Sequence, residues 1–226
     1  MTDFGNQGDS RCRFMSGPWR LAINGRCYSH LSRPTPVIDT SLLISAYAQG
    51  IFPMAMEDGS IGWFSPDPRG ILPLDTFVAS RRLLRVVRQG KFEIAFDRGF
   101  EAVMRACAED REDGTWISDE IVESYVALHR RGLAHSVEAW QDGTLVGGLY
   151  GVHLGGAFFG ESMFHRVTDA SKVALVALVD RLRQNGFTLL DTQWTTPHLE
   201  QFGAVEIPRE EYLTRLTAAL ARRCPF

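Results

Sequence analysis

The sequence predicts an α+β protein in which a mainly antiparallel sheet is flanked by helices. Three strand-like segments, AHSVEAW, TLVGGLYGVHL and GAFFGESMF, lie between residues 134 and 164 and are separated by Asp142-Gly143 and Gly155-Gly156. Such glycine turns between apolar runs predict an antiparallel meander. Residues 169–185 then repeat apolar side chains at helical spacing. The 226 residues, 45% hydrophobic with net charge -3, are ordinary for a globular chain of one or two domains.

The first residues predict little fixed structure. Residues 1–36 are rich in Gly, Arg and Ser, so we expect a mobile or loosely packed leader. Asp39 or Thr40 can cap a short helix that ends at Gly50. Its expected apolar stripe is Leu42, Leu43, Ala46 and Tyr47. The next segment, GIFPMAMEDGSIGWFSPDPRGIL, contains three prolines and predicts a rigid, aromatic loop.

A basic helix is predicted from Ser80 to Lys91, with a turn at Gly90. No acidic residue interrupts its cations, which are Arg81, Arg82, Arg85, Arg88 and Lys91. One interpretation is a solvated helix face, which is what most charge runs are. The other is a surface that contacts a phosphate backbone.

The remaining elements follow from periodicity. We expect a strand over residues 92–96, a helix over 100–107, and a helix that starts at Ser118 and stops at Gly132. Asp169 or Thr168 can cap the helix that runs to residue 185. The strand FTLLDTQ and a C-terminal helix complete the chain.

Three polar residues stand at the ends of apolar strands. Glu161 ends a glycine-rich hairpin without other charge, and could hold a cationic amine, although pairing with an arginine is a structural alternative. Asp191 and Gln193 share one face of their strand, because side chains alternate. Glutamine has little basicity, so any role as a base needs help from Asp191 or the substrate.

Several function classes lack their first requirement. The sequence has no GxSxG, HExxH or GxxxxGK[ST] motif, its histidines are scattered singly, and its four cysteines form no CxxC pair. We therefore expect no metal, no disulfide framework and a cytoplasmic protein. No signal peptide is expected, and the run from Val173 to Val179 is too short to span a membrane.

The strongest indication comes from nine stretches taken in order. They are AYAQGIFPM (46–54), WFSPDPRGIL (63–72), GTWIS (114–118), LHRRGLAHSVE (128–138), LVGGLYGV (145–152), GESMF (160–164), DASK (169–172), LLDTQ (189–193) and FGAVEIPR (202–209). Together they resemble the bacterial leucyl/phenylalanyl-tRNA–protein transferases over about residues 39–216.

This resemblance implies transfer of leucine or phenylalanine, and less methionine, from aminoacyl-tRNA to proteins that begin with arginine or lysine. The product would be an N-degron, and no cofactor is needed. The resemblance also implies a small N-terminal domain, here 37–68, and a domain similar to the GNAT acyltransferases, here 69–226. We expect a monomer.

The resemblance also implies roles by position. Gln193 and Asp191 match the proposed catalytic pair, with Asp191 polarising Gln193, and Glu161 matches a carboxylate near the acceptor amine. The aminoacyl pocket would be formed by Leu149, Phe158, Met163 and Leu190. The terminal adenosine would lie by Trp116, the loop from Phe52 to Met54, and Trp63. The basic helix becomes the candidate surface for the acceptor stem.

Three residues depart from the family pattern. Met54 stands where many members have tryptophan, His165 where serine is common, and Asp169 where asparagine is frequent. Thr192 replaces a frequent cysteine, and we expect its side chain to point away from the Asp191 and Gln193 pair. Two rivals stay open: an acetyl-CoA-dependent transferase, for which RVTDASK lacks the glycine of a pyrophosphate loop, and a non-catalytic tRNA- or degron-binding module.

Overall fold

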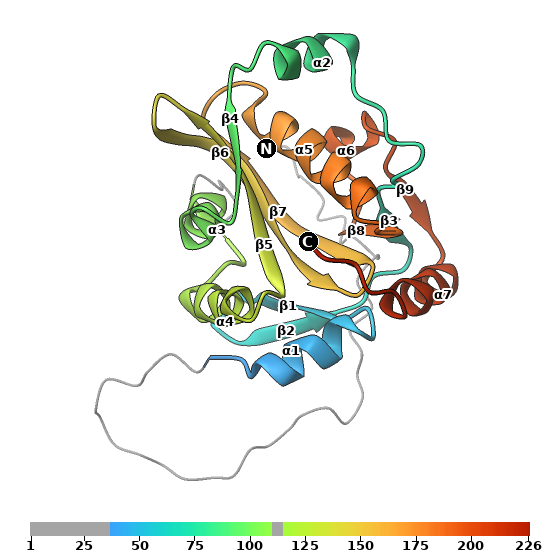
Figure 1. Ribbon diagram of the computed structural model, residues 1–226. Coiled ribbons are helices and arrows are strands. Elements are labelled where there is room, and N and C mark those ends of the chain that lie inside the picture. The colour runs from blue at the N-terminus through green and yellow to red at the C-terminus, as the bar shows by residue number, and fades with distance from the viewer. Residues whose placement is uncertain (1–36, 110–114) are drawn as a thin grey trace, which may run out of the picture.

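The computed structural model describes residues 37–109 and 115–226, and the leader expected over residues 1–36 lies outside them. Within that part a seven-stranded sheet has the order β4-β5-β6-β7-β8-β3-β9 (Figure 1). Its strands are β3 (Arg69–Ile71), β4 (Glu93–Phe96), β5 (Ala134–Gln141), β6 (Thr144–Leu154), β7 (Ala157–His165), β8 (Leu189–Gln193) and β9 (Val205–Ile207). Only β7 and β8 pair in parallel, so the predicted meander and the predicted α+β class are confirmed.

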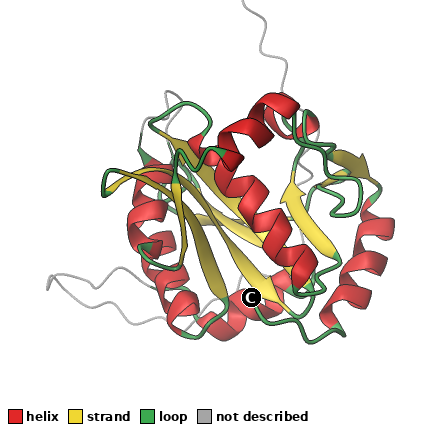
Figure 2. Ribbon diagram, turned by 45° about the horizontal axis from the view of Figure 1, so that its top comes forward, coloured by secondary structure: helices red, strands yellow, loops and turns green. Residues whose placement is uncertain are grey.

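Helices cover both faces of this sheet (Figures 1 and 2). A Cβ on Gly147 of β6 would meet Ala170 of α5 (Ala170–Gln184), whereas one on the next residue, Gly148, would lie near Val103 of α3 (Phe100–Ala108). Because successive strand residues face opposite sides, α5 and α3 lie on opposite faces. The other helices are α1 (Thr40–Tyr47), α2 (Arg81–Arg88), α4 (Asp119–Arg130), α6 (Pro197–Glu200) and α7 (Arg209–Leu220).

The core is correspondingly divided into two clusters. One contains side chains of α1, α3, α4 and α7, among them Tyr47, Tyr125 and Tyr212, and the other contains those of α2 and α5. Burial of these apolar faces is the main source of stability. The parallel β7 and β8 are joined by α5, since a parallel pair needs a crossover connection.

The segment expected to be a rigid loop is instead largely regular. Residues 50–72 form the hairpin of β1 (Phe52–Ala55) and β2 (Ile61–Phe64), followed by β3 in the main sheet. The Asp58-Gly59 pair lies between β1 and β2, and Gly59 has φ of 77°. An Asp-Gly pair between two apolar runs favours a β-hairpin. The three prolines of the segment favoured the prediction of a loop instead. The small N-terminal part is confirmed, whereas its end at residue 68 stays a prediction.

Two details of the helices also differ from expectation. Asp39 does cap α1, but Leu42 is 43% exposed and only Leu43, Ala46 and Tyr47 face inward. Asp169 occupies the N-cap position of α5 in a left-handed conformation with φ of 71°, yet its side chain makes no cap hydrogen bond. It is used elsewhere, as described below.

Candidate active site

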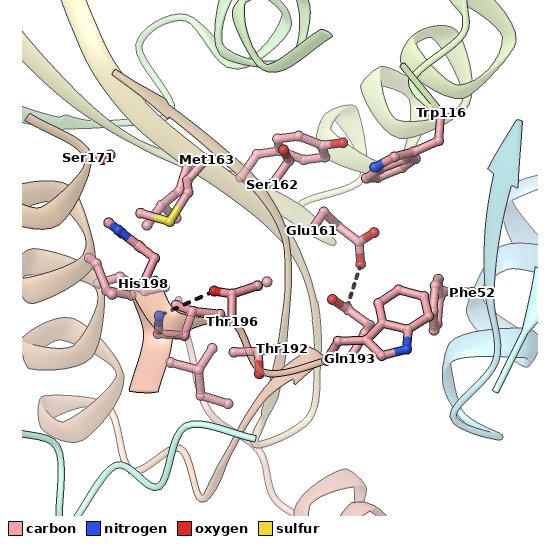
Figure 3. Close-up of a pocket in the computed structure, with 18 of the residues that line it drawn as sticks. Phe52, Trp116, Glu161, Ser162, Met163, Ser171, Thr192, Gln193, Thr196 and His198 are labelled. Carbon is pink, nitrogen blue, oxygen red and sulfur yellow. Dashed lines mark hydrogen bonds between the residues drawn. The ribbon is translucent and has the colours of Figure 1, made fainter. Parts of the chain in front are cut away.

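A cavity of about 480 Å³ lies where β7, β8, α5 and β1 meet (Figure 3). Its wall is mostly apolar, and Glu161 and Gln193 point toward one another at the end that also holds Trp116 and Phe52. Met163 and His198 lie at the other end (Figure 3). Such a cavity, apolar with a few convergent polar groups, is typical of a binding site for part of a small or flexible substrate.

Most of the residues expected in the aminoacyl pocket line this cavity. Leu149, Met163 and Leu190 do so. Phe158 does not, because its ring is fully buried behind the wall and packs at 5.4 Å from the ring of Phe226. Leu175 and Leu178 of α5 also line the cavity and were not predicted. They lie in the uninterrupted apolar run from Val173 to Val179, so nothing distinguished these two positions from core residues.

The aromatic end of the cavity is only partly as expected. Trp116 and Met54 line it, but Trp63 does not and is 37% exposed on β2. Phe52 of β1 takes its place, and Trp194 meets the Phe52 ring edge-on at 5.3 Å. Strand alternation explains the difference. Trp63 is opposite Pro53 in the hairpin register, so its side chain lies on the same face as Pro53 and on the other face from Met54.

Glu161 is held by two tyrosines and by Gln193. Its Oε1 accepts hydrogen bonds from the Tyr47 hydroxyl at 2.8 Å and from Gln193 Nε2 at 3.4 Å, and its Oε2 accepts one from the Tyr125 hydroxyl at 3.5 Å. Burial raises the pKa of the Glu161 carboxyl to about 8, although the bond from Tyr47 opposes this. Tyr47 and Tyr125 also contact one another through their hydroxyls, and burial raises the pKa of both.

Asp191 is placed differently from the prediction. It is fully buried and does not line the cavity, whereas Thr192 does. Its Oδ1 accepts from Arg69 Nε at 2.9 Å and from the Gln193 backbone N–H at 2.8 Å. Its Oδ2 accepts from Arg69 Nη2 at 2.6 Å and from the Tyr212 hydroxyl at 2.7 Å. The expected polarisation of the Gln193 side-chain amide by Asp191 therefore has no contact to carry it.

Gln193 reaches the cavity by a change of backbone conformation. Its φ is 57°, in the left-handed region, so the alternation that would put it beside Asp191 is broken at the end of β8. Asp191 and Gln193 thus do not share one face, and Thr192, which was expected to point away from both, lines the cavity together with Gln193. Arg69 and Tyr212 are the residues that the sequence analysis missed, and only the arginine of the PDPR stretch offered a signal.

The basic helix α2 is exposed along most of its length. Arg81, Arg85, Arg88 and Lys91 are exposed. The Arg82 guanidinium is less available to bind a phosphate, because its Nη1 and Nη2 each donate a hydrogen bond of 2.7 Å to the Asp169 carboxylate. These bonds lower the pKa of the Asp169 carboxyl. His165 lines the mouth of the cavity, and burial together with the charge of Lys172 lowers the pKa of nearby His198.

Three histidines expected to be scattered lie close together, away from the cavity. His135 Nδ1 is 2.8 Å and His129 Nδ1 is 3.8 Å from the Asp97 carboxylate, and the rings of His135 and His153 are 5.6 Å apart. Even so, no group of three or more His, Cys, Asp or Glu side chains among residues 37–109 and 115–226 has a metal-binding arrangement. In the same ranges, no helix has the length and hydropathy to cross a membrane.

Comparison with known proteins agrees with this picture. A family model described as leucyl/phenylalanyl-tRNA protein transferase matches residues 71–217, and one for the N-terminal domain of the same family matches residues 37–67. A leucyl/phenylalanyl-tRNA–protein transferase from Gloeobacter violaceus is 59% identical over 82% of this chain and 95% of the relative. One from Herpetosiphon aurantiacus is 60% identical over 85% of this chain and 100% of the relative.

Among solved structures, L-PGS from Bacillus licheniformis is similar at a TM-score of 0.42 and 13% identity, covering 70% of this chain and 66% of that one.

The family model and the relatives show that this α+β chain, with its cavity, is an enzyme of the transferase class. The chain belongs to the leucyl/phenylalanyl-tRNA–protein transferase family.

Proposed function

We propose that this enzyme transfers leucine or phenylalanine, and methionine less well, from aminoacyl-tRNA to the N-terminal α-amino group of proteins that begin with arginine or lysine. A peptide bond forms, and the product carries an N-degron. The observation that carries the proposal is the apolar cavity that ends at the hydrogen-bonded Glu161 and Gln193. We further propose that the enzyme acts as a monomer in the cytoplasm.

The apolar wall suits an uncharged side chain. Leu149, Met163 and Leu190, together with Leu175 and Leu178, offer no ionised group to a bound aminoacyl side chain. A wall of this kind excludes charged amino acids but separates side chains that differ by one methylene only about 10 to 200-fold. Low transfer of methionine is therefore part of the proposal.

The polar end suits the acceptor amine. An α-amino group has a pKa of about 7.7 to 8.0, close to the pKa of about 8 of the Glu161 carboxyl. Proton transfer is most effective between groups whose pKa values lie near the working pH. We assign proton acceptance to Glu161, and positioning of the amine to the Gln193 carbonyl oxygen, since Gln193 Nε2 already donates to Glu161.

The chemical step then needs no further activation. The neutral amine nitrogen attacks the ester carbonyl carbon of the aminoacyl-tRNA, the new C–N bond forms, and the bond to the terminal ribose oxygen breaks. The proton lost by the amine passes to the Glu161 carboxylate, and the Glu161 carboxyl then gives a proton to the ribose oxygen, which leaves as a hydroxyl. Holding both reactants in place supplies much of the rate gain in such a reaction.

The tRNA itself is assigned to two surfaces. Trp116 and Phe52, with Met54, are the residues available to the terminal adenosine at the aromatic end of the cavity. The exposed cations of α2 are assigned to the acceptor stem, because a like-signed cluster is what phosphate contacts need.

Labelling of peptides tests this function. Purified protein with charged leucyl-tRNA should label a peptide that begins with Arg and not a matched peptide that begins with Gly. Equal labelling of both peptides would contradict the acceptor specificity. No labelling while the tRNA stays charged would instead favour a non-catalytic tRNA-binding module. Acetyl-CoA should cause no thermal shift.

A further inference from the structure

The four hydrogen bonds to the Asp191 carboxylate occupy both of its oxygens. Two come from the Arg69 guanidinium, one from the Tyr212 hydroxyl and one from the Gln193 backbone N–H. A carboxylate has about four acceptor positions, so this one has none left for a substrate or for the Gln193 side chain. Since it also lies outside the cavity, Asp191 can affect a reaction there only through the residues it holds.

The residue that it holds most directly is Gln193. A non-glycine residue in the left-handed region costs roughly 1–2 kcal/mol, and such strain persists only where neighbouring groups fix it. Here the Gln193 N–H is fixed by Asp191 Oδ1 at 2.8 Å, and the next residue closes the turn through Trp194 N–H to the Thr192 carbonyl at 2.6 Å. This turn directs the Gln193 side chain toward Glu161 (Figure 3).

Arg69 connects this turn to the opposite wall of the cavity. Its side chain is only 1% exposed, and its third hydrogen bond runs from Nη1 to the Gly50 carbonyl at 2.9 Å. Gly50 immediately precedes the segment that enters β1, which supplies Phe52 and Met54 to the cavity. The guanidinium also lies 4.4 Å from the Tyr212 ring centroid and 5.1 Å from that of Phe52.

The geometry leaves little freedom in this connection. Gly70 is opposite Gln193 in the sheet, and a Cβ at Gly70 would come within 2.4 Å of the Trp194 carbonyl carbon. A Cβ at Gly50 would come within 2.7 Å of the Tyr212 ring. Backbone, arginine and tyrosine are therefore packed without space for an alternative arrangement of the Gln193 turn.

From these contacts we infer that Arg69 is a positioning residue for aminoacyl transfer: through Asp191 and Tyr212 it holds Gln193 in the left-handed turn, and through Gly50 it sets the distance between Gln193 and the β1 wall. The inference rests on the function proposed above and assigns Asp191 a positioning role, distinct from polarisation of the glutamine amide. A planar guanidinium is required, because a lysine cannot bond both carboxylate oxygens and the Gly50 carbonyl from one nitrogen in this geometry.

Two substitutions test the inference. Arg69→Lys keeps the positive charge but loses the planar guanidinium that bonds both oxygens of Asp191. Tyr212→Phe keeps the ring but removes the hydroxyl bonded to Asp191. A displacement of about 1 Å in a reacting group can cost about 10²-fold in rate. We expect kcat to fall about 10 to 100-fold in each variant, with KM for leucyl-tRNA changed less than about threefold.

A double-mutant comparison separates positioning from general damage. If Arg69 acts through Gln193, Arg69→Lys should lower kcat little further in a Gln193→Ala background, because residues that work as one unit are not additive. Arg105→Lys is the matched control, since Arg105 pairs with Glu101 and Asp119 and none of the three lines the cavity.

The outcomes are distinct. Full kcat in both variants would overturn the inference, and so would effects that multiply with Gln193→Ala. If Arg69→Lys does not fold, kcat is compared in the same way for Tyr212→Phe alone and together with Gln193→Ala. If the wild-type protein labels no peptide, the proposed function fails instead of this inference.

Discussion

Glu161 is the residue whose ionisation most affects the proposed reaction. Its folded pKa of about 8 lies above its ordinary value of 4.5, so the folded protein binds more protons than the unfolded chain between these limits. Below about pH 4.5 the carboxyl is protonated in both states, so its ionisation does not change the free energy of unfolding. As the pH rises from 4.5 toward 8, the free energy of unfolding falls.

Glu161→Gln should remove this dependence. The variant should gain stability relative to the wild type as the pH rises from 5 to 8, by up to a few kcal/mol, because the neutral amide has no charge to desolvate. Urea denaturation of both proteins at several pH values measures this. A constant difference across the range would contradict the raised pKa. The wild type should also transfer faster as the pH rises through about 8, because Glu161 and the acceptor amine both lose protons there, whereas the variant should show a less steep rise that comes from the amine alone.

Asp191 and Gln193 should differ sharply in their effect on stability. Asp191→Asn leaves the buried Arg69 guanidinium without its partner, and breaking a buried ion pair in this way costs about 3–5 kcal/mol. Gln193→Ala keeps the backbone N–H bonded to Asp191, so its free energy of unfolding should change by less than about 1 kcal/mol. Chemical denaturation compares them, and equal losses would count against the buried network.

At the scale of elements, α2 and the start of α5 are joined by the ion pair of Arg82 and Asp169. Arg82 donates two hydrogen bonds to Asp169, and the pair withdraws one cation from the otherwise acid-free surface of α2. Because Arg82 is 63% exposed, the pair contributes little to stability. Its effect on tRNA binding is the more informative quantity.

Asp169→Asn should strengthen binding of tRNA and make it more salt-dependent. Each added phosphate contact changes the slope of log K against log salt by about 1, and releasing Arg82 adds one. Glu211→Gln is the matched control, since it removes a carboxylate from an arginine pair on α7. Titrations at several salt concentrations measure the slope. An unchanged slope in Asp169→Asn would mean that Arg82 makes no phosphate contact when it is released.

The β1 and β2 hairpin raises a second question at this scale. Met54 lines the cavity, while Phe52 and Trp116 supply the aromatic surface. Met54→Trp should lower KM for aminoacyl-tRNA, because stacking of a base on an aromatic ring contributes about 1–3 kcal/mol. Steady-state kinetics with leucyl-tRNA tests this, and a raised KM would mean that the adenosine lies elsewhere.

For the whole molecule, the sequence predicted the architecture better than the site. Periodicity and glycine turns located the meander, α5 and the basic helix, because those signals are local. Glu161 was predicted from the charge-free glycine-rich hairpin around it, whereas the cavity residues Leu149, Met163 and Leu190 were predicted through family resemblance. The partners of Asp191 were not predicted. Arg69 lies 122 positions from Asp191 in the sequence, and no local sequence pattern indicates a buried ion pair between residues so far apart.

Two features could not be derived from alternation alone. The left-handed conformation of Gln193 brings its side chain to the cavity that Thr192 lines, whereas Asp191 lies outside that cavity. The Asp58-Gly59 turn made a hairpin from a segment whose prolines favoured a loop. In each case a single backbone conformation decided which side chains reach the site.

The most direct test of the account is single-turnover transfer from bound leucyl-tRNA to a peptide that begins with Arg. Gln193→Ala should bind leucyl-tRNA with an affinity within about threefold of the wild type, yet form the peptide bond about 10²-fold more slowly, because only the positioning of the amine is lost. Transfer at the wild-type rate, or a large loss of tRNA binding, would contradict the placement of the reaction between Gln193 and Glu161.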